Sequence, residues 1–339
     1  MLHRLPALAL VAMLGAACGS APATSAGLHQ VAAIRVGSNA GILAFGFGSA
    51  WAPNSSDGTV SRIDLASNRV TATIRIGDYA TYHAAGCDRY GSVHSYMVTN
   101  WTLRQCDQPT GIATGSGVVW VARNQDHSIA VIDPATDRVT SSIPLPVAPF
   151  QLASEGSELW VTSLDDNAVA IIDESSRRLV DTVRSLPQGP TGIAFLGGAA
   201  WVVGSYAGAL TRIDLATHRP TATATLPCST TCYSPLKPLA ITAAFGALWV
   251  RNEGNATLAR VDPRTLAVTS HPIDSFWGRD GLDSIAEYGV SLWVGGLRLQ
   301  RVASTGRVID RYPRTATVIT AGAGSLWFTE DSGRLVRLE

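Results

Sequence analysis

Charged residues are scarce in this chain of 339 residues, making up 15% of it, and its 26 basic side chains are balanced by 26 acidic ones. Lys237 is the only lysine, so no lysine cluster is available to bind phosphates. The even balance argues against a nucleic-acid-binding surface, and the 46% hydrophobic content argues against disorder. No run reaches 18 apolar residues, which argues against a membrane-spanning body. With 32 glycines and only 7% aromatic residues, the composition predicts a globular chain with many turns.

The N-terminus has the features of an export signal. His3 and Arg4 precede an apolar run (5–17), which has the length of a signal-peptide core and is too short to cross a bilayer. Small residues then lead to Cys18 and to a low-complexity stretch (21–27). We therefore expect export, and exclude this segment from the fold.

The region around Cys18 resembles a bacterial lipoprotein signal, in which the cysteine is acylated and becomes the new N-terminus. The leucine that this family places three residues before the cysteine lies one position earlier here, at Leu14. The resemblance implies a signal peptide (1–17), a flexible tether (18–27) and a lipoprotein of the cell envelope. Ordinary secretion, to the periplasm or beyond, with cleavage after Ala17 or a few residues later, is the alternative.

Four cysteines remain when Cys18 is set aside, and an even number in an exported chain predicts disulfides. Local pairing of Cys87 with Cys106 and of Cys228 with Cys232 is the simplest of the three connectivities. A zinc site is the rival, but the Cys-x-x-Cys spacing and a nearby histidine pair are missing. No cofactor is predicted.

A repeat is the strongest signal in the chain. A small or apolar pair followed by tryptophan recurs at Trp51, Trp120, Trp160, Trp201, Trp249, Trp293 and Trp327. Successive tryptophans lie 34 to 48 residues apart, except for 69 between the first two, which suits four short strands per repeat. The spacing predicts an all-β, seven-bladed β-propeller with four-stranded antiparallel blades, in which the tryptophans pack between blades.

An aspartate recurs after the third strand of the repeat, with Ser or Thr two or three residues later, at Asp64, Asp133, Asp173, Asp214 and Asp262. A short acceptor side chain at the start of a turn caps backbone N–H groups, so this recurrence predicts turn architecture rather than a catalytic array. The final repeat ends after its third strand (334–339), while residues 31–37 match the fourth-strand sequence 70–77. The N-terminal strand is therefore expected to pair into the last blade and close the ring.

The segment Val-Ile-Asp-Pro-Ala-Thr-Asp-Arg-Val (131–139) resembles the YVTN-type propeller repeat, and Leu-Trp-Phe-Thr-Glu (326–330) resembles repeats of the streptogramin lyase family. The resemblance covers residues 28–339 apart from insertions, and it implies a seven-bladed ring. It implies little about function, because one scaffold hosts binding proteins, enzymes and surface proteins.

Three connections between a fourth strand and the next first strand are enlarged, at 78–109, 227–238 and 274–283. Because such connections share one face of a propeller, the three insertions are expected to form one rim. Aromatic and cationic residues on this rim are candidates for ligand binding. The candidates are Trp101, Arg104, Arg123, Tyr233, Arg251, Trp277 and Arg279.

These features predict a monomeric, non-catalytic binding module for a protein, peptide or glycan, touching the membrane only through its anchor. The alternative is a metal-assisted lyase or hydrolase resembling streptogramin lyase. That family's chemistry implies a closely spaced Glu-x-His, which this chain lacks, although an activity through His83 or His94 stays open. A quinone-dependent redox enzyme ranks last.

Overall fold

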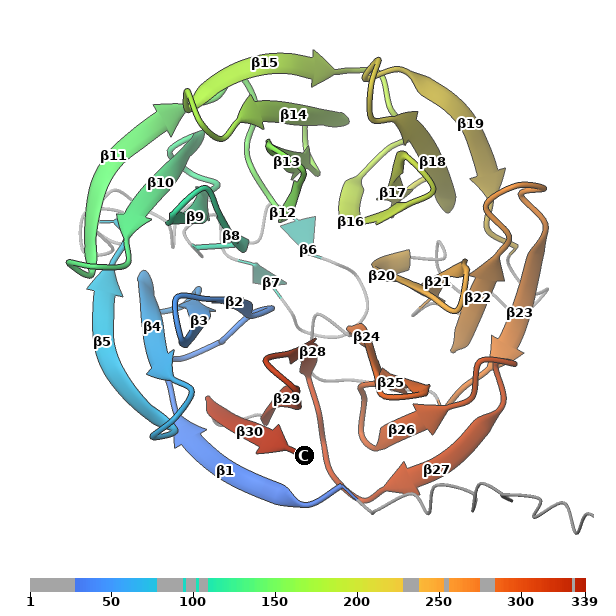
Figure 1. Cartoon of the computed structure of the whole chain (residues 1–339). Coiled ribbons are helices and arrows are strands. Elements are labelled where there is room, and N and C mark those ends of the chain that lie inside the picture. The colour runs from blue at the N-terminus through green and yellow to red at the C-terminus, as the bar shows by residue number, and fades with distance from the viewer. Residues whose placement is uncertain are drawn as a thin grey trace, which may run out of the picture.

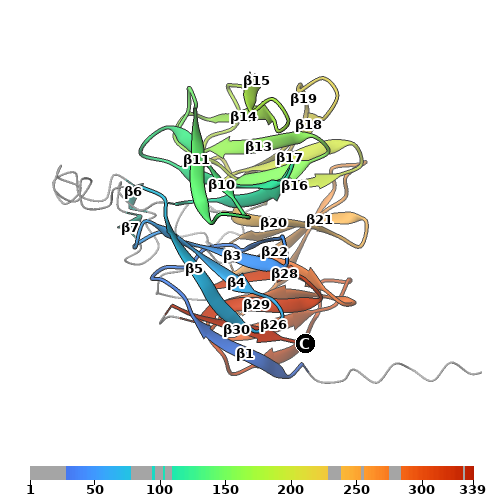
Figure 2. The same ribbon diagram turned by 60° about the vertical axis from the view of Figure 1, so that its left-hand side comes forward.

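The computed structural model describes residues 28–77, 109–227, 238–252, 256–274, 284–330 and 333–339, with the backbone of 94–95 and 102–103. Seven four-stranded antiparallel sheets surround a central axis as blades (Figure 1). The chain is thus an all-β, seven-bladed propeller, as the tryptophan spacing predicts. Two short strands, β6 (His94–Ser95) and β7 (Thr102–Leu103), pair with each other and lie outside the ring (Figure 2). In the described part of the chain, no helix is long and apolar enough to cross a membrane.

Each complete blade runs from an inner strand at the axis to an outer strand at the rim. Blade 1 contains β2 (Ala44–Gly46), β3 (Ser49–Asn54), β4 (Thr59–Asp64) and β5 (Arg69–Arg75). Blade 2 contains β8 (Ile112–Gly115), β9 (Val118–Arg123), β10 (Ser128–Asp133) and β11 (Arg138–Pro144). Blade 3 contains β12 (Leu152–Glu155), β13 (Glu158–Ser163), β14 (Ala168–Asp173) and β15 (Arg178–Val183). Blade 4 contains β16 (Pro190–Leu196), β17 (Ala199–Gly204), β18 (Ala209–Asp214) and β19 (Pro220–Thr225).

The remaining blades keep this order until the chain ends. Blade 5 contains β20 (Pro238–Ala244), β21 (Ala247–Asn252), β22 (Thr257–Val261) and β23 (Val268–Pro272). Blade 6 contains β24 (Ile285–Tyr288), β25 (Ser291–Val294), β26 (Leu299–Val302) and β27 (Val308–Tyr312). Blade 7 contains β28 (Val318–Gly322), β29 (Ser325–Glu330) and β30 (Arg334–Leu338), with β1 (Gln30–Arg35) as its outer strand.

Strand β1 closes the ring, as the match between residues 31–37 and 70–77 predicts. It pairs antiparallel with β30, for example Ile34 with Leu335, and the two chain ends are also joined by backbone hydrogen bonds between His29 and Glu339. Ile34 is buried and joins the apolar cluster of Trp327 and Leu335. The first and last described segments therefore hold the same blade together.

The connections divide the ring into two faces. The upper face carries the connections from outer strands to the next inner strands, and the hairpins between second and third strands. The lower face carries the turns between first and second strands and between third and fourth strands. All three enlarged connections predicted from the sequence join an outer strand to an inner one, so each leaves and re-enters the ring at the upper face.

The seven repeated tryptophans occupy the same place on the second strand of each blade. All are at most 3% exposed. In five blades the indole N–H donates to a backbone carbonyl five residues earlier, as in Trp201 to Leu196. These residues fill the space between blades, as predicted.

Cationic side chains cover several of these tryptophans and reach the next blade. The guanidinium of Arg62 lies 5.0 Å from the ring centroid of Trp51 and forms an ion pair with Asp137 of blade 2 at 2.8 Å. Arg337 covers Trp327 at 5.1 Å in the same way and bonds to blade 1. The guanidinium thus packs on one blade and forms polar contacts with its neighbour.

Between blades 3 and 4, a histidine packs against the repeated tryptophan in place of an arginine. The ring of His218 meets Trp160 edge-on, with centroids 5.5 Å apart. Its Nε2 lies 3.1 Å from Glu158 and its Nδ1 lies 3.3 Å from Asp181, so both nitrogens face carboxylates of blade 3. His218 is therefore part of the junction between these blades.

The recurrent aspartates cap the turns between third and fourth strands, as predicted. In blade 3, Asp173 accepts hydrogen bonds from the Ser176 backbone N–H and the Ser175 hydroxyl, both at 2.7 Å. The other four aspartates make equivalent bonds within their own turns. Their recurrence is architectural.

These caps predict a loss of stability in acid. Hydrogen bonds led by the Ser176 backbone N–H lower the pKa of Asp173 from 3.8 to about 2, and the pKa values of Asp64, Asp214 and Asp262 shift downward for the same reason. Because the folded-state pKa lies below the unfolded one, the stabilisation is complete above about pH 4 and is lost as the pH falls toward about 2. Thermal melts across this range should show the melting temperature falling, and Asp173→Asn should make the fall shallower. Glu155→Gln, at the exposed end of β12, is the control, and an equal change in both variants would contradict the assignment.

Candidate functional site

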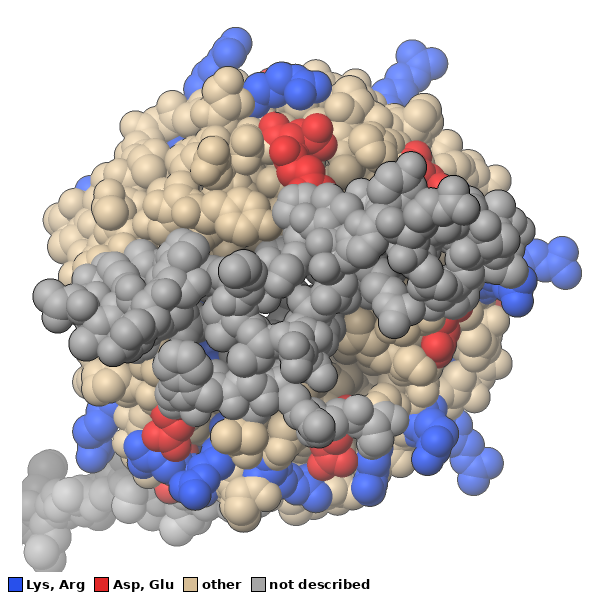
Figure 3. Space-filling view, turned by 180° about the vertical axis from the view of Figure 1, so that it is seen from behind, with Lys and Arg blue, Asp and Glu red and all other residues tan. Residues whose placement is uncertain are grey.

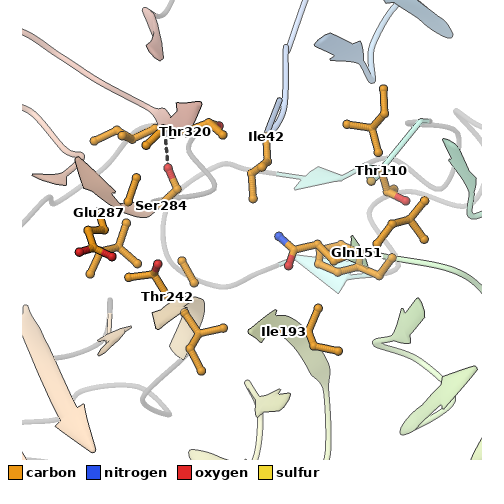
Figure 4. A pocket seen from close by; sticks show the side chains of 18 residues that line it. Ile42, Thr110, Gln151, Ile193, Thr242, Ser284, Glu287 and Thr320 are labelled. Carbon is orange, nitrogen blue, oxygen red and sulfur yellow. Dashed lines mark hydrogen bonds between the residues drawn. The ribbon is translucent and has the colours of Figure 1, made fainter. Parts of the chain in front are cut away.

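A central cavity of about 400 Å³ lies between the inner strands, and all seven blades contribute to its wall. Ile42, Thr110, Gln151 and Ser284 stand one or two residues before an inner strand, so the cavity reaches the upper end of the axis. Glu287 and Ala321 of its wall lie one residue before the lower ends of β24 and β28. We call it the funnel. Figure 4 shows its labelled side chains arranged around the open centre.

The funnel wall alternates apolar and neutral polar groups. Isoleucines supply much of the apolar surface, namely Ile42, Ile112, Ile193, Ile241, Ile285 and Ile319. Among the described residues, Glu287 is the only ionisable side chain in the wall. Figure 3 shows arginine side chains around the edge of the ring on the upper face. The funnel is thus chemically suited to a ligand that is mostly uncharged.

Several polar side chains of the wall connect neighbouring blades. The Thr110 hydroxyl donates to the Pro149 carbonyl at 3.2 Å, and the Leu43 backbone N–H donates to the Thr320 hydroxyl at 3.2 Å. The Ser284 hydroxyl accepts from the backbone N–H of Ile319 (Figure 4). These three hydroxyls are already used in the architecture of the ring.

Three other polar side chains of the wall are not used in this way. Within the described part of the chain, Gln151, Thr242 and Glu287 form no side-chain hydrogen bond or ion pair. They come from blades 3, 5 and 6, and Gln151 and Thr242 are only partly buried. A neutral amide, a hydroxyl and one carboxylate are therefore available to a ligand from three directions.

Arg123, a candidate from the sequence, lies at the upper end of β9. Its side chain is 20% exposed and forms an ion pair with Asp126 in the following hairpin. The pair lies on the same face as the funnel, although neither residue lines it. A ligand contacting Arg123 would have to compete with Asp126.

Arg251, a second candidate, is buried between blades 5 and 6. Only 3% of the residue is exposed, and its guanidinium donates to the Gly295 carbonyl at 2.5 Å. A Cβ at Gly295 would lie 2.5 Å from the Ala316 backbone carbonyl oxygen, so only glycine fits there. The structure therefore places Arg251 in a contact between blades.

The other candidates lie outside the described residues. They are Trp101, Arg104, Tyr233, Trp277 and Arg279, together with Cys18, Cys87, Cys106, Cys228 and Cys232. Their roles, including acylation and disulfide pairing, stay predictions.

The described histidines lie away from the funnel. His127 and His218 are in turns, His29 directly precedes β1, and His271 lies in the outer strand β23, where burial lowers its pKa. Within the described segments, no cluster of three or more His, Cys, Asp or Glu side chains is arranged to hold a metal ion.

The fold is similar to that of several solved structures. A catalytically inactive variant of virginiamycin B lyase from Staphylococcus aureus, with quinupristin, has 16% sequence identity and a TM-score of 0.66, covering 92% of this chain and 98% of that one. A streptogramin B lyase has 16% sequence identity and a TM-score of 0.67, covering 92% of this chain and 97% of that one. BamB from Moraxella catarrhalis has 13% sequence identity and a TM-score of 0.61, covering 92% of this chain and 99% of that one. At these identities the likeness concerns the fold alone. No family model matches the chain, and no curated protein matches its sequence.

The three unpaired groups of the funnel are not among the candidates predicted from the sequence. Gln151, Thr242 and Glu287 lie on or next to inner strands, where the neighbouring positions are small or apolar. A polar residue at such a position is the sequence feature that could have predicted them. The tryptophan repeat marks the second strands of the blades and gives no information about these inner positions.

Proposed function

We propose that this chain is an exported, lipid-anchored and non-catalytic binding module that takes its ligand at the funnel and the surrounding upper rim. The observation that carries the proposal is the set of unpaired side chains Gln151, Thr242 and Glu287, in a wall whose other polar side chains bond within the ring. Polar groups at a binding site fix the orientation of a ligand, while the apolar wall supplies contact area. Export and anchoring rest on the N-terminal signal sequence.

The ligand class follows from the donors and acceptors available. A side-chain amide both donates and accepts hydrogen bonds, as does a hydroxyl, so Gln151 and Thr242 suit hydroxyl or amide groups. Glu287 adds an acceptor for one such group or for a single amine. Glycans and peptides carry these groups, and the cavity of about 400 Å³ accepts a fragment of such a ligand.

A thermal-shift screen of the protein against glycans, peptidoglycan fragments, macrolactones and divalent metals tests the proposal. A ligand at 100 times its dissociation constant adds about 2.7 kcal/mol of stability, which raises the melting temperature by several degrees. Gln151→Ala and Thr242→Val are expected to remove the shift caused by a glycan or peptide. Thr73→Val, at an exposed position of the outer strand β5, is the matched control and should keep it. A ligand shift that survives both funnel substitutions would contradict the assignment.

A metal-assisted lyase or hydrolase is the second candidate, favoured by the similarity in fold to two streptogramin-type lyases. It predicts a thermal shift with a divalent metal and with a macrolactone, both reduced by Glu287→Gln. A metal shift that also requires His83 or His94 would favour this candidate over the binding module.

A further inference from the structure

The lower face carries an exposed apolar arc around the axis. It is formed by the turns between first and second strands in four consecutive blades, from blade 5 through blades 6 and 7 to blade 1. Phe245 is 36% exposed, Val290 78% and Phe47 42%, and Ala323 of blade 7 is also exposed. We call these four residues the apolar arc. They lie on the face opposite the funnel mouth.

The turns themselves do not require these side chains. Phe47 and Phe245 have φ values of 58° and 51°, in the left-handed region that disfavours bulky residues. The corresponding positions of blades 2, 3 and 4 are Ser116, Gly156 and Gly197. Both phenylalanines are therefore exposed to water at positions where a small residue would be more favourable for the isolated ring.

Exposed arginines surround the arc on the same face. Each stands at the first residue of a fourth strand or in the turn that precedes it, in blades 1 to 6: Arg69, Arg138, Arg178, Arg219, Arg264 and Arg307. None of the six forms an ion pair with another described residue. The aspartates of the same turns are held by hydrogen bonds within each turn. The face thus combines an apolar arc with six arginines that form no ion pair with a described residue and can contact phosphates. The carboxylates of the same turns are also charged, but they accept hydrogen bonds within the turns.

The described chain also begins on this face. Leu28 and His29 lead into the lower end of β1, beside the last residue, Glu339. Nine residues (19–27), or about ten residue steps, separate Cys18 from Leu28. A flexible chain of that length spans about 17 Å on average and at most about 35 Å. An acyl chain on Cys18 would therefore hold the lower face close to the bilayer.

We propose that the lower face docks on an anionic lipid surface, with the apolar arc at the level of the headgroups and the six arginines on lipid phosphates. Apolar side chains combined with cations are the common requirement for binding at a membrane surface. Docking in this way turns the funnel away from the membrane and toward its ligand. This contact is additional to the lipid anchor and does not depend on the ligand of the funnel.

Hydrogen–deuterium exchange of the mature chain, isolated from an expressing bacterium, tests the proposal on vesicles. With vesicles of phosphatidylcholine and phosphatidylglycerol in equal parts, peptides covering 44–49, 243–248 and 287–292 should exchange about tenfold more slowly than without vesicles. Peptides covering the upper hairpins 124–127 and 164–167 should not change. Vesicles of phosphatidylcholine alone should give a smaller effect, because they lack the anionic charge.

Two triple variants make the test specific. Phe47→Ser, Phe245→Ser and Val290→Ser together should abolish the vesicle-dependent protection, whether or not the acyl chain keeps the protein on the vesicle. Val180→Ser, Leu297→Ser and Ile309→Ser together remove exposed apolar side chains elsewhere and should keep it. Equal thermal melts would establish that both variants are folded. Unchanged exchange in the wild type, or protection at the upper hairpins, would overturn the proposal. If the same peptides are already protected without vesicles, and this protection grows with protein concentration, the face binds a second copy of the chain. That result would also overturn the proposal.

Discussion

Deletion of residues 28–37 is expected to leave no stable ring at physiological temperature. The deletion removes β1, which pairs with β30 through five residue pairs, and it exposes the apolar surface that Ile34 covers. Backbone hydrogen bonds contribute about 1 kcal/mol each, and burial of one isoleucine contributes about 2 kcal/mol. The expected loss of about 5 kcal/mol or more is comparable with the whole stability of many domains. Circular dichroism during heating would measure it.

Deletion of residues 19–27 is the control for this experiment, because it shortens the chain by a similar length and leaves Cys18 and β1 in place. The control should melt as the wild type does. A cooperative transition at the wild-type temperature after deletion of 28–37 would show that β1 is dispensable, and would contradict the closure of the ring by this strand.

Replacement of Trp201 by alanine is expected to cost about 3–5 kcal/mol, which corresponds to a fall in melting temperature of roughly 6–12 °C. Trp201 is completely buried between blades 4 and 5, where it packs with Leu210 and Leu248. The substitution leaves a cavity there and also leaves the Leu196 carbonyl without its indole donor at 3.1 Å. Differential scanning calorimetry would measure the effect.

Val180→Ala is the control for the tryptophan substitution. Val180 is 51% exposed on the outer strand β15, so its truncation should change the stability by no more than about 0.5 kcal/mol. A similar small cost for Trp201→Ala would mean that the repeated tryptophans are not the packing residues of the ring.

The features of the fold that repeat could be predicted from the sequence. Seven tryptophans at similar spacing predicted seven blades, because each blade places the same residue type against its neighbour. The match between 31–37 and 70–77 predicted the closure, since a strand that repeats the sequence of a fourth strand fits only a place where one is missing. The capping role of Asp173 followed from its recurrence in other blades.

The features that occur once could not be predicted in this way. Arg251 departs from the repeat, and its polarity was interpreted as a binding feature. The structure buries it against Gly295, a contact with the next blade that spacing within one repeat cannot reveal. Gln151 and Thr242 were not predicted to bind a ligand, yet their side chains are unpaired in the funnel. This difference from Thr110 and Thr320, whose hydroxyls connect neighbouring blades, appears only in the structure.

The pairing of β1 with β30 also determines when this protein can fold. The two strands are about 300 residues apart in sequence, so the ring cannot close until the last residues of the chain are available. Contacts of such long range form slowly, because the entropy of a very large loop must be overcome first. While its last residues are still inside the ribosome, or inside any export channel, this chain cannot yet form its final blade. Loss of β1 or of β30 should therefore have the same consequence, an open ring exposed to proteolysis.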